Sequence, residues 1–239
     1  MESPDFDIVI PVYNEAENIE HCLLEIKKNI KGRFEVFIVY DFEEDNTIPV
    51  INRIKNEFDF PINLVRNSFG RGPANAIKTG FIHSKSKAIL VIMGDISDDL
   101  RVVDAMYAKI KEGYDVVCGS RYMKGGKQIG GPFIKGIMSR LAGLSLYLFA
   151  GLPTHDATNS FKMYNKDLLD NITIESKMGF EIGIEIVAKA FINGYRITEV
   201  PCTWMGRKAG SSNFKIIKWM PNYLRWYFKI FKYGICKIK

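Results

Sequence analysis

Carboxylate side chains stand at three places in the sequence where a short apolar run ends. Glu15, Asp41 and Asp95 each lie within three residues of the end of such a run. Like charges that are brought together repel one another, so a cluster of them needs a compensating cation or hydrogen-bond donors. A hard divalent ion held by one or two carboxylates and by substrate phosphates fits this need. Asp95 is the first candidate ligand and Asp98 the second, although Asp98 and Asp99 can also be read as helix caps.

Predicted strands and helices, which must position these residues, alternate along the first half of the chain. Strands are predicted at Phe6–Val12, Phe34–Tyr40, Pro61–Val65, Ala88–Met93 and Tyr114–Cys118. Helices are predicted at Glu15–Lys31, Ile48–Phe58, Pro73–His83 and Asp99–Glu112. This rhythm predicts an α/β fold with a mainly parallel, Rossmann-like sheet covered by helices. Ligands of such sheets bind at the carboxyl ends of the strands, which is where the carboxylates stand.

The pattern changes after the fifth predicted strand. Gly119–Gly131 is a glycine-rich loop that carries Arg121, and Phe133–Ala150 is an apolar helix. A further strand, helix and strand are predicted at Asn159–Tyr164, Gly179–Asn193 and Arg196–Val200. Because no stretch reaches 18 uncharged apolar residues, a membrane-spanning helix is not expected.

The net charge of +6 is the sum of two unlike parts. Up to Val200 the chain has 24 basic and 27 acidic residues, whereas nine basic residues and no acidic one follow. In Phe214–Lys239, basic and apolar residues recur at helical spacing on opposite faces, with aromatic residues at the borders. This pattern favours a helix that lies in a membrane surface, with Pro221 dividing it into two short helices. The alternatives are a terminal helix that packs on the body and, less in keeping with the carboxylate cluster, a nucleic-acid patch.

The chain therefore divides into a body, residues 1–213, and a tail, residues 214–239. No secretory signal pattern opens the sequence, because acidic residues interrupt its start. The four cysteines are widely spaced, which fits a reducing compartment. Together with the tail, these features predict a cytoplasmic protein that is peripheral on the membrane.

Six segments of the body closely resemble family 2 glycosyltransferases with the GT-A fold. They resemble most closely the polyprenyl-phosphate glycosyltransferase branch, typified by dolichyl-phosphate mannosyltransferase. The segments are Ile10–Ile19, Arg71–Gly80, Met93–Asp99, Asp115–Tyr122, His155–Lys162, and Glu199–Pro201 with Arg207–Ser212. They occur in the family's order and cover nearly all of the body, so the resemblance implies the GT-A fold and a hexosyltransferase activity.

The resemblance also implies roles for individual residues. Those that match the nucleotide-sugar site are Pro11, Tyr13, Glu15 and Asp41, of which Asp41 would read the base. Asp95 matches the aspartate that binds Mg²⁺ or Mn²⁺ beside the donor diphosphate. Those that match the acceptor side are Arg121, Arg207 and Ser212, which would hold a phosphate, and Asp156, which would face the donor sugar and the acceptor.

Two departures from the family pattern concern the metal and the base. Met93 replaces the first aspartate of the Asp-x-Asp motif, so Asp95 is its only strict match. The usual Asp-Asp-Gly-Ser after the second strand is here Tyr40–Glu43. These changes bear on metal affinity and base preference rather than on the fold.

The expected function is an inverting transfer of a sugar from a GDP- or UDP-linked donor to a polyprenyl phosphate at the membrane surface. An ionised phosphate acceptor needs cations to position it rather than a general base, and arginine supplies a bidentate fork. Transfer to a hydroxyl of a surface glycan would need such a base, with Asp156 as the candidate. A sugar nucleotidyltransferase and a non-catalytic membrane-binding homologue are further alternatives, and a membrane-protein partner stays open.

Overall fold

The structure, a computed structural model, describes residues 4–177, 179–206 and 216–238. The strands are β1 (Phe6–Pro11), β2 (Phe34–Tyr40), β3 (Ile62–Arg66), β4 (Ala88–Val91), β5 (Val116–Ser120), β6 (Lys127–Ile129), β7 (Lys162–Asn165), β8 (Ile197–Pro201) and β9 (Thr203–Met205). The helices are α1 (Ile19–Asn29), α2 (Thr47–Ile54), α3 (Pro73–His83), α4 (Val103–Lys111), α5 (Phe133–Ala150), α6 (Lys166–Asn171), α7 (Ile182–Ile192) and α8 (Ile216–Ile238). Two 3-10 turns, η1 (Lys55–Glu57) and η2 (Leu100–Val102), precede β3 and α4.

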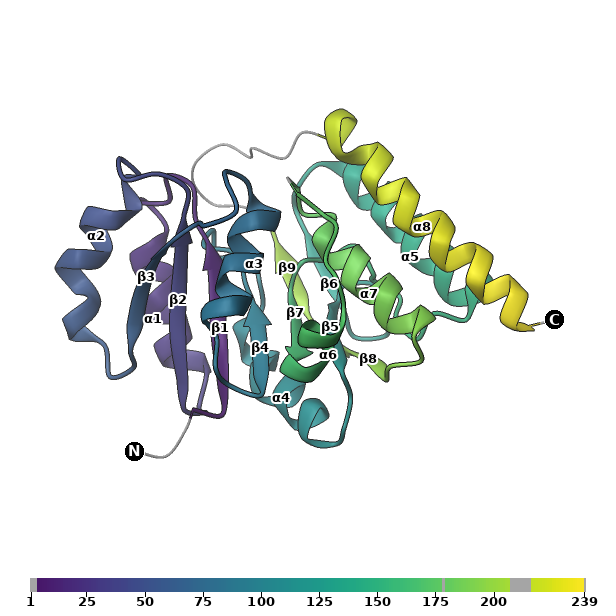
Figure 1. Ribbon diagram of the computed structural model, residues 1–239, viewed down its shortest axis with the longest axis horizontal. Helices are drawn as coiled ribbons and strands as arrows, with labels where there is room; N and C mark the ends of the chain where they lie inside the picture. Colours follow the sequence, from purple (N-terminus) through teal and green to yellow (C-terminus); the bar gives the residue numbers. More distant parts are fainter. Residues whose placement is uncertain (1–3, 178, 207–215, 239) are drawn as a thin grey trace.

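A seven-stranded sheet in the order β3-β2-β1-β4-β7-β5-β8 forms the centre of the molecule (Figure 1). Its strands are parallel except β7, which runs antiparallel between β4 and β5. The mainly parallel sheet predicted from the sequence is therefore confirmed. β6 and β9 pair separately as a small parallel sheet.

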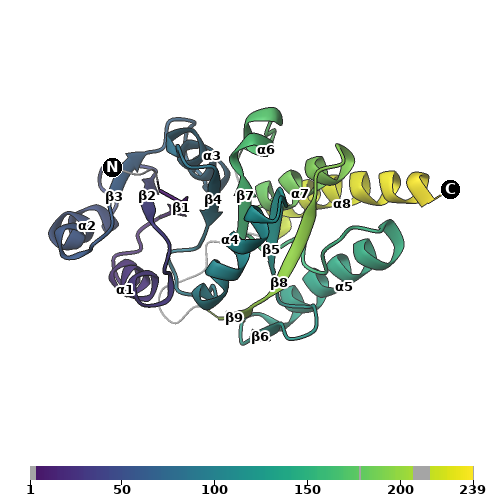
Figure 2. The same ribbon diagram turned by 90° about the horizontal axis from the view of Figure 1, so that it is seen from below.

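Helices cover both faces of the sheet and create two cores (Figure 2). Because successive side chains of a strand point to opposite faces, Val9, Val39 and Val91 pack with α3, α6 and α7. Their neighbours Ile8 and Leu90 pack on the other face with α1, α2 and α4. Burial on both sides explains why these strands are continuous apolar runs rather than alternating ones.

The sequence missed three short elements, β6, β9 and α6. The two strands have three residues each and lie in segments rich in glycine and polar residues, where no period is visible. The loop predicted at Gly119–Gly131 therefore contains β6, which pairs with β9 across more than 70 residues of chain.

The C-terminal segment forms one helix, so the prediction of two short helices divided at Pro221 is wrong. Proline in the second turn removes a single backbone hydrogen bond, and α8 continues through it. Its side chains Trp226 and Ile230 are buried against the body, with α5 and α7 as the neighbouring helices. The boundary drawn at residue 213 lies outside the described residues.

Two glycines allow unusually close packing around α5. A Cβ at Gly143 would lie 2.0 Å from the backbone oxygen of His155, and one at Gly234 would lie 2.1 Å from that of Ala150. Gly143 thus lets α5 sit directly on the loop before β7, and Gly234 lets α8 cross the end of α5. α5 is also the one helix in the described part of the chain that is long and apolar enough to cross a membrane, by length and composition.

Candidate active site

One large cavity, of about 1260 Å³, opens at the carboxyl ends of β1, β2 and β4 and extends between α5 and α8. The residues that line it and were predicted as site residues are Pro11, Tyr13, Glu15, Asp41, Asp95 and Arg121. Asp98 and Asp156 do not line it. Arg207 and Ser212 lie outside the described residues, so their roles stay predictions.

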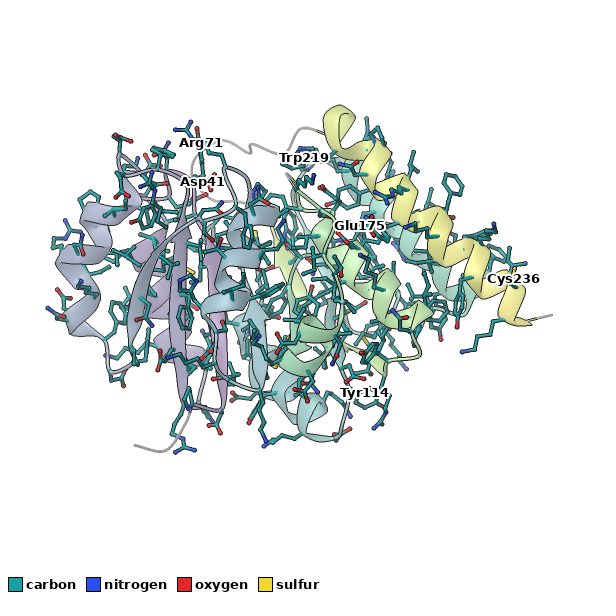
Figure 3. The ribbon with its side chains drawn as sticks, in the orientation of Figure 1. Asp41, Arg71, Tyr114, Glu175, Trp219 and Cys236 are labelled. Atoms are coloured by element: carbon teal, nitrogen blue, oxygen red, sulfur yellow. The ribbon has the colours of Figure 1, made fainter. Side chains whose placement is uncertain are left out.

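Tyr13 and Arg71 line the sheet end of the cavity, and the half-buried Phe42 lies between them. The Phe42 ring lies edge-on to Tyr13, with 5.5 Å between centroids, and the Arg71 guanidinium lies 5.1 Å from the Phe42 centroid. Figure 3 shows Arg71 close to Asp41 at this edge. Sequence reasoning did not single out Phe42 or Arg71, although Arg71 opens one of the motifs quoted above. An aromatic face beside a guanidinium suits a planar, anionic ligand such as a nucleotide.

Asp41 shapes the loop before α3. Its Oδ1 accepts a hydrogen bond from Asn67 Nδ2 at 2.7 Å, and its Oδ2 accepts one from the Gly72 N–H at 2.9 Å. Each carboxylate oxygen can accept a second hydrogen bond, so the group can hold this loop and still face a ligand.

The turn after β1 is held by the acidic segment after β2. Asp45 is fully buried and accepts the N–H of Asn14 at 3.0 Å, and the Thr47 hydroxyl accepts the N–H of Glu15 at 2.9 Å. Asn14 has φ +56°, a left-handed conformation that asparagine tolerates. Part of the acidic cluster predicted after the second strand is thus structural, and it fixes the turn that presents Tyr13 and Glu15.

Asp95 reaches the cavity from a strained turn after β4. Ile96 has φ +63°, which is rare for a β-branched residue and costs about 1–3 kcal/mol. The turn persists because Asp95 Oδ1 accepts the Ser97 N–H at 3.2 Å and the Ser97 carbonyl accepts the Met205 N–H at 3.0 Å. β9 therefore clamps the turn that aims Asp95.

Asp98 binds the backbone at the end of β4 through its carboxylate. Its Oδ2 accepts the Met93 N–H at 2.9 Å, and burial raises the pKa of its carboxyl to about 7. Asp99 pairs with Arg101 at 2.7 Å and accepts the Thr203 N–H at 3.0 Å. Both residues hold the segment around Asp95, but they do so through Met93, Arg101 and Thr203 and not as helix caps, because neither η2 nor α4 has a side-chain cap hydrogen bond.

The residues at this edge of the sheet can bind a divalent ion only together with phosphate oxygens from a substrate. Among the described residues, no three His, Cys, Asp or Glu side chains lie together as ligands for a metal. Asp95 and the Ser97 hydroxyl are hard oxygen donors at the cavity wall. Mg²⁺ is often held by one or two carboxylates with the phosphates of a substrate, so Asp95 suits such an ion when a diphosphate is bound.

Arg121 and Asp156 form a buried ion pair. Arg121 Nε lies 2.7 Å from Asp156 Oδ2 and Nη2 lies 2.9 Å from Oδ1, while the Arg121 N–H also donates to Oδ2 at 3.1 Å. The Asp156 side chain is 0% exposed and that of Arg121 is 11% exposed. Nη2 further donates to the Ser139 hydroxyl of α5 at 2.9 Å. Asp156 therefore positions Arg121, and of the two residues only Arg121 lines the cavity.

His155 and Glu199 form a structural pair beside this one. Glu199 accepts hydrogen bonds from the His155 N–H at 2.8 Å and from the Thr154 hydroxyl at 3.0 Å, and it also pairs with the His155 ring. The ring stacks on Tyr147 of α5 with 3.8 Å between centroids. These contacts fix the loop that carries Asp156.

The other half of the cavity has an apolar and aromatic wall. It is built by α5, α7, β9 and α8, and sequence reasoning did not assign it to the site. Its members are Met138, Leu141, Ala142, Phe180, Ile184, Trp204, Trp219, Met220, Tyr223, Leu224 and Tyr227. Figure 3 shows Trp219 at the start of α8, across from Asp41 and Arg71. One cavity thus joins a carboxylate-bearing polar end to an apolar end, with Arg121 at its wall.

Two curated proteins are similar in sequence to this chain over most of its length. It is 28% identical to a dolichol-phosphate mannosyltransferase of Pyrococcus furiosus over 231 residues, which are 95% of this chain and 63% of that protein. It is 24% identical to a polyprenol monophosphomannose synthase of Mycolicibacterium smegmatis, over 89% of this chain and 85% of that protein. The chain thus spans less than two thirds of the length of the Pyrococcus relative.

Solved structures share the fold. Glucosyl-3-phosphoglycerate synthase from Mycobacterium tuberculosis, in complex with Mn²⁺, UDP and glucosyl-3-phosphoglycerate, superimposes with a TM-score of 0.69 at 15% identity. The match covers 96% of this chain and 79% of that one. The fold expected from the sequence motifs is therefore confirmed. Residues 7–173 match the model of Glycosyl transferase family 2, and because this match covers more than half of the chain, the protein belongs to that family.

Proposed function

We propose that the protein transfers a sugar from a nucleotide sugar to a polyprenyl phosphate, with inversion at the anomeric carbon. The observation that carries this proposal is the two-part cavity, which Arg121 lines while it binds Ser139 of the apolar helix α5. The names of the Pyrococcus and Mycolicibacterium relatives support the same acceptor class.

The polar end is suited to the nucleotide diphosphate. Tyr13 and Arg71, which both contact the Phe42 ring, offer an aromatic surface and a cation, while Asp41 and Glu15 offer acceptors for base and ribose groups. Asp95 would hold Mg²⁺ or Mn²⁺, which stabilises the negative charge that develops on a departing diphosphate. Structural neighbours that were solved with UDP and Mn²⁺ or Mg²⁺ support this choice of ions. The base, GDP or UDP, is left open.

The acceptor side is suited to a phosphate rather than to a hydroxyl. In the reaction a phosphate oxygen forms a bond to the anomeric carbon, and the bond from that carbon to the nucleoside diphosphate breaks. An ionised phosphate needs no general base, and Arg121 is held in place by Asp156 and Ser139 to orient it. Arg207 and Ser212 are proposed to complete this phosphate site.

Transfer to a glycan hydroxyl is the weaker alternative. It needs a carboxylate that can take a proton from the acceptor, and the candidate was Asp156. Asp156 is fully buried and its two oxygens are engaged by Arg121, so it does not meet the acceptor. The described part of the site therefore favours the phosphate acceptor.

The proposed place of action is the cytoplasmic face of a membrane, reached through the tail, residues 214–239. The exposed face of α8 keeps basic side chains, of which Lys229 and Lys232 are examples. A membrane-protein partner is compatible with this arrangement.

A donor screen tests the proposal. The purified chain is incubated with a panel of GDP- and UDP-sugars, Mg²⁺ or Mn²⁺ and polyprenyl phosphate, and lipid-linked product is measured by mass spectrometry. A sugar-phosphate lipid from one donor is expected. A parallel incubation replaces the lipid with a soluble glycan acceptor; product on the glycan hydroxyl and none on the phosphate lipid would contradict the proposal.

A further inference from the structure

Lys162 is a buried lysine that the proposed chemistry does not use. It opens β7, which lies between β4 and β5 in the middle of the sheet, and the residue is 0% exposed. A buried charge is costly unless it is paired and hydrogen-bonded. The contacts of this ammonium therefore indicate what it does in the fold.

The Lys162 ammonium binds the turn that precedes its own strand. Nζ donates a hydrogen bond to the carbonyl oxygen of Ala157 at 3.1 Å and another to that of Asn159. Lys162 and Tyr164 point to the same face of the sheet, which α7 covers, and a Cβ at Gly183 of α7 would lie 3.6 Å from Nζ. α7 thus encloses the ammonium, and one turn accepts two of its three N–H donors.

Charged groups of the site surround this ammonium. Burial lowers the pKa of Lys162, and the Arg121 guanidinium acts in the same direction. Cys118 and the carboxylates of Asp156 and Asp98 act in the opposite direction and raise this pKa. The carboxylates therefore favour the protonated amine, which is the form with three donors.

The turn that Lys162 binds, residues 156–160, forms part of the cavity wall beside Arg121. Thr158, Asn159 and Ser160 line the cavity. The Thr158 hydroxyl lies 2.6 Å from the hydroxyl of Ser139, and Ser139 also accepts a hydrogen bond from the Arg121 guanidinium. A displacement of the 156–160 turn would therefore disturb the cavity wall and the contacts of Arg121 together.

We propose that Lys162 is a positioning residue of the transfer site. Its ammonium holds the 156–160 turn from inside the fold, so that Asp156 keeps the Arg121 guanidinium in place for the acceptor phosphate. Asp156 begins this turn, and its Oδ1 accepts the Asn159 N–H at 3.2 Å while it also binds Arg121, so the turn and the ion pair share one carboxylate. The phosphate in this inference rests on the proposed function.

Substitution by methionine removes the donors and keeps the bulk of the side chain. A displacement of about 1 Å near reacting groups can cost roughly 100-fold in rate. Lys162→Met is therefore expected to raise KM for polyprenyl phosphate at least about tenfold, and KM for the nucleotide sugar less than about threefold. Lys162→Arg, which restores a cation with N–H donors, should lie closer to the unmodified chain than Lys162→Met does. A role in filling space predicts the reverse order, because arginine is the larger side chain.

Met163→Ala is the matched control for lost stability. Met163 is the next residue of β7, is also 0% exposed and packs in the core on the other face of the sheet. It should lower Tm, as Lys162→Met also should, but without a selective change in KM for the acceptor. If Lys162→Met does not fold, Lys162→Gln, which keeps neutral N–H donors, is measured in its place with the same expected direction.

Hydrogen–deuterium exchange provides a measurement that needs no acceptor. Lys162→Met is expected to speed exchange of the amides of the 156–160 turn, and Met163→Ala is not. Unchanged exchange in the turn, or KM values for donor and acceptor that rise by the same factor, would overturn the positioning role and leave the proposed function standing. Absence of transfer to polyprenyl phosphate by the unmodified chain would instead overturn the proposed function, and the exchange rates would still decide whether Lys162 holds the turn.

Discussion

Removal of the Asp156 carboxylate is expected to be among the most destabilising single changes near the cavity. The Arg121 side chain is nearly buried, and Asp156→Ala removes its ion-pair partner. The change removes the two short bonds to Nε and Nη2 and the bonds from the backbone N–H groups of Arg121 and Asn159. Breaking one side of a buried ion pair costs about 3–5 kcal/mol in the free energy of unfolding.

An exposed ion pair supplies the comparison. Lys109 and Glu112 lie 2.7 Å apart, but their side chains are 37% and 50% exposed. Solvent screens such a pair, so Glu112→Ala is expected to destabilise the protein much less than Asp156→Ala. For a domain of this size, each kcal/mol shifts Tm by roughly 2–4 °C, so Asp156→Ala should lower Tm by about 6–20 °C.

Urea unfolding followed by tryptophan fluorescence measures both variants. A similar m-value for the two proteins would show that the midpoint difference reports stability. If Asp156→Ala costs no more than Glu112→Ala, the Arg121–Asp156 pair does not stabilise the site and the positioning role of Asp156 is wrong. A milder variant, Asp156→Asn, should raise KM for the phosphate acceptor more than KM for the donor.

Four further outcomes are expected. Asp95→Asn should abolish transfer and weaken Mn²⁺ binding in the presence of the nucleoside diphosphate, as measured by calorimetry, with an unchanged circular dichroism spectrum; undiminished turnover would contradict the metal role. Arg121→Lys loses the fork that binds Asp156 and fixes the cation, and it should raise KM for the phosphate acceptor roughly ten- to hundredfold with a smaller effect on the donor; equal changes in both would argue against this role. Gly143→Ala should destabilise the chain by about 1–3 kcal/mol in thermal unfolding, because its Cβ would collide with the His155 carbonyl; a gain, as helix propensity alone implies, would refute that packing. Maleimide at pH 7.5 should label only Cys236 of the native protein, since burial raises the pKa of the other three thiols, and labelling of a second cysteine by mass spectrometry would refute their burial.

The most accurately predicted elements were those in which the local sequence pattern and the packing in the fold favour the same secondary structure. β2, α3 and α5 have the predicted bounds, because a buried parallel strand, a proline at a helix start and a long apolar helix are strong local signals. The antiparallel direction of β7 has no such signal, since strand direction depends on the connections around it. α8 passes through Pro221 because packing on the body outweighs one lost hydrogen bond.

The strand ends that carry the site residues could be predicted from the sequence, but the hydrogen bonds that these residues make could not. Glu15, Asp41 and Asp95 meet at one cavity because parallel strands present their carboxyl ends together. Nothing local indicates that Asp98 accepts the Met93 N–H, or that Asp156 binds Arg121 from 35 residues away. Such hydrogen bonds depend on the packed loops, and they separate the carboxylates that face the cavity from those that build it.

Transfer to polyprenyl phosphate in a defined assay tests the central proposal most directly. The chain is given its best nucleotide sugar, Mn²⁺ and polyprenyl phosphate, and the lipid product and the released nucleoside diphosphate are quantified together. The unmodified chain is expected to yield equal amounts of sugar-linked polyprenyl phosphate and nucleoside diphosphate. Asp95→Asn is expected to yield neither. Nucleoside diphosphate released without any sugar on the phosphate lipid, across all donors, would contradict the proposal.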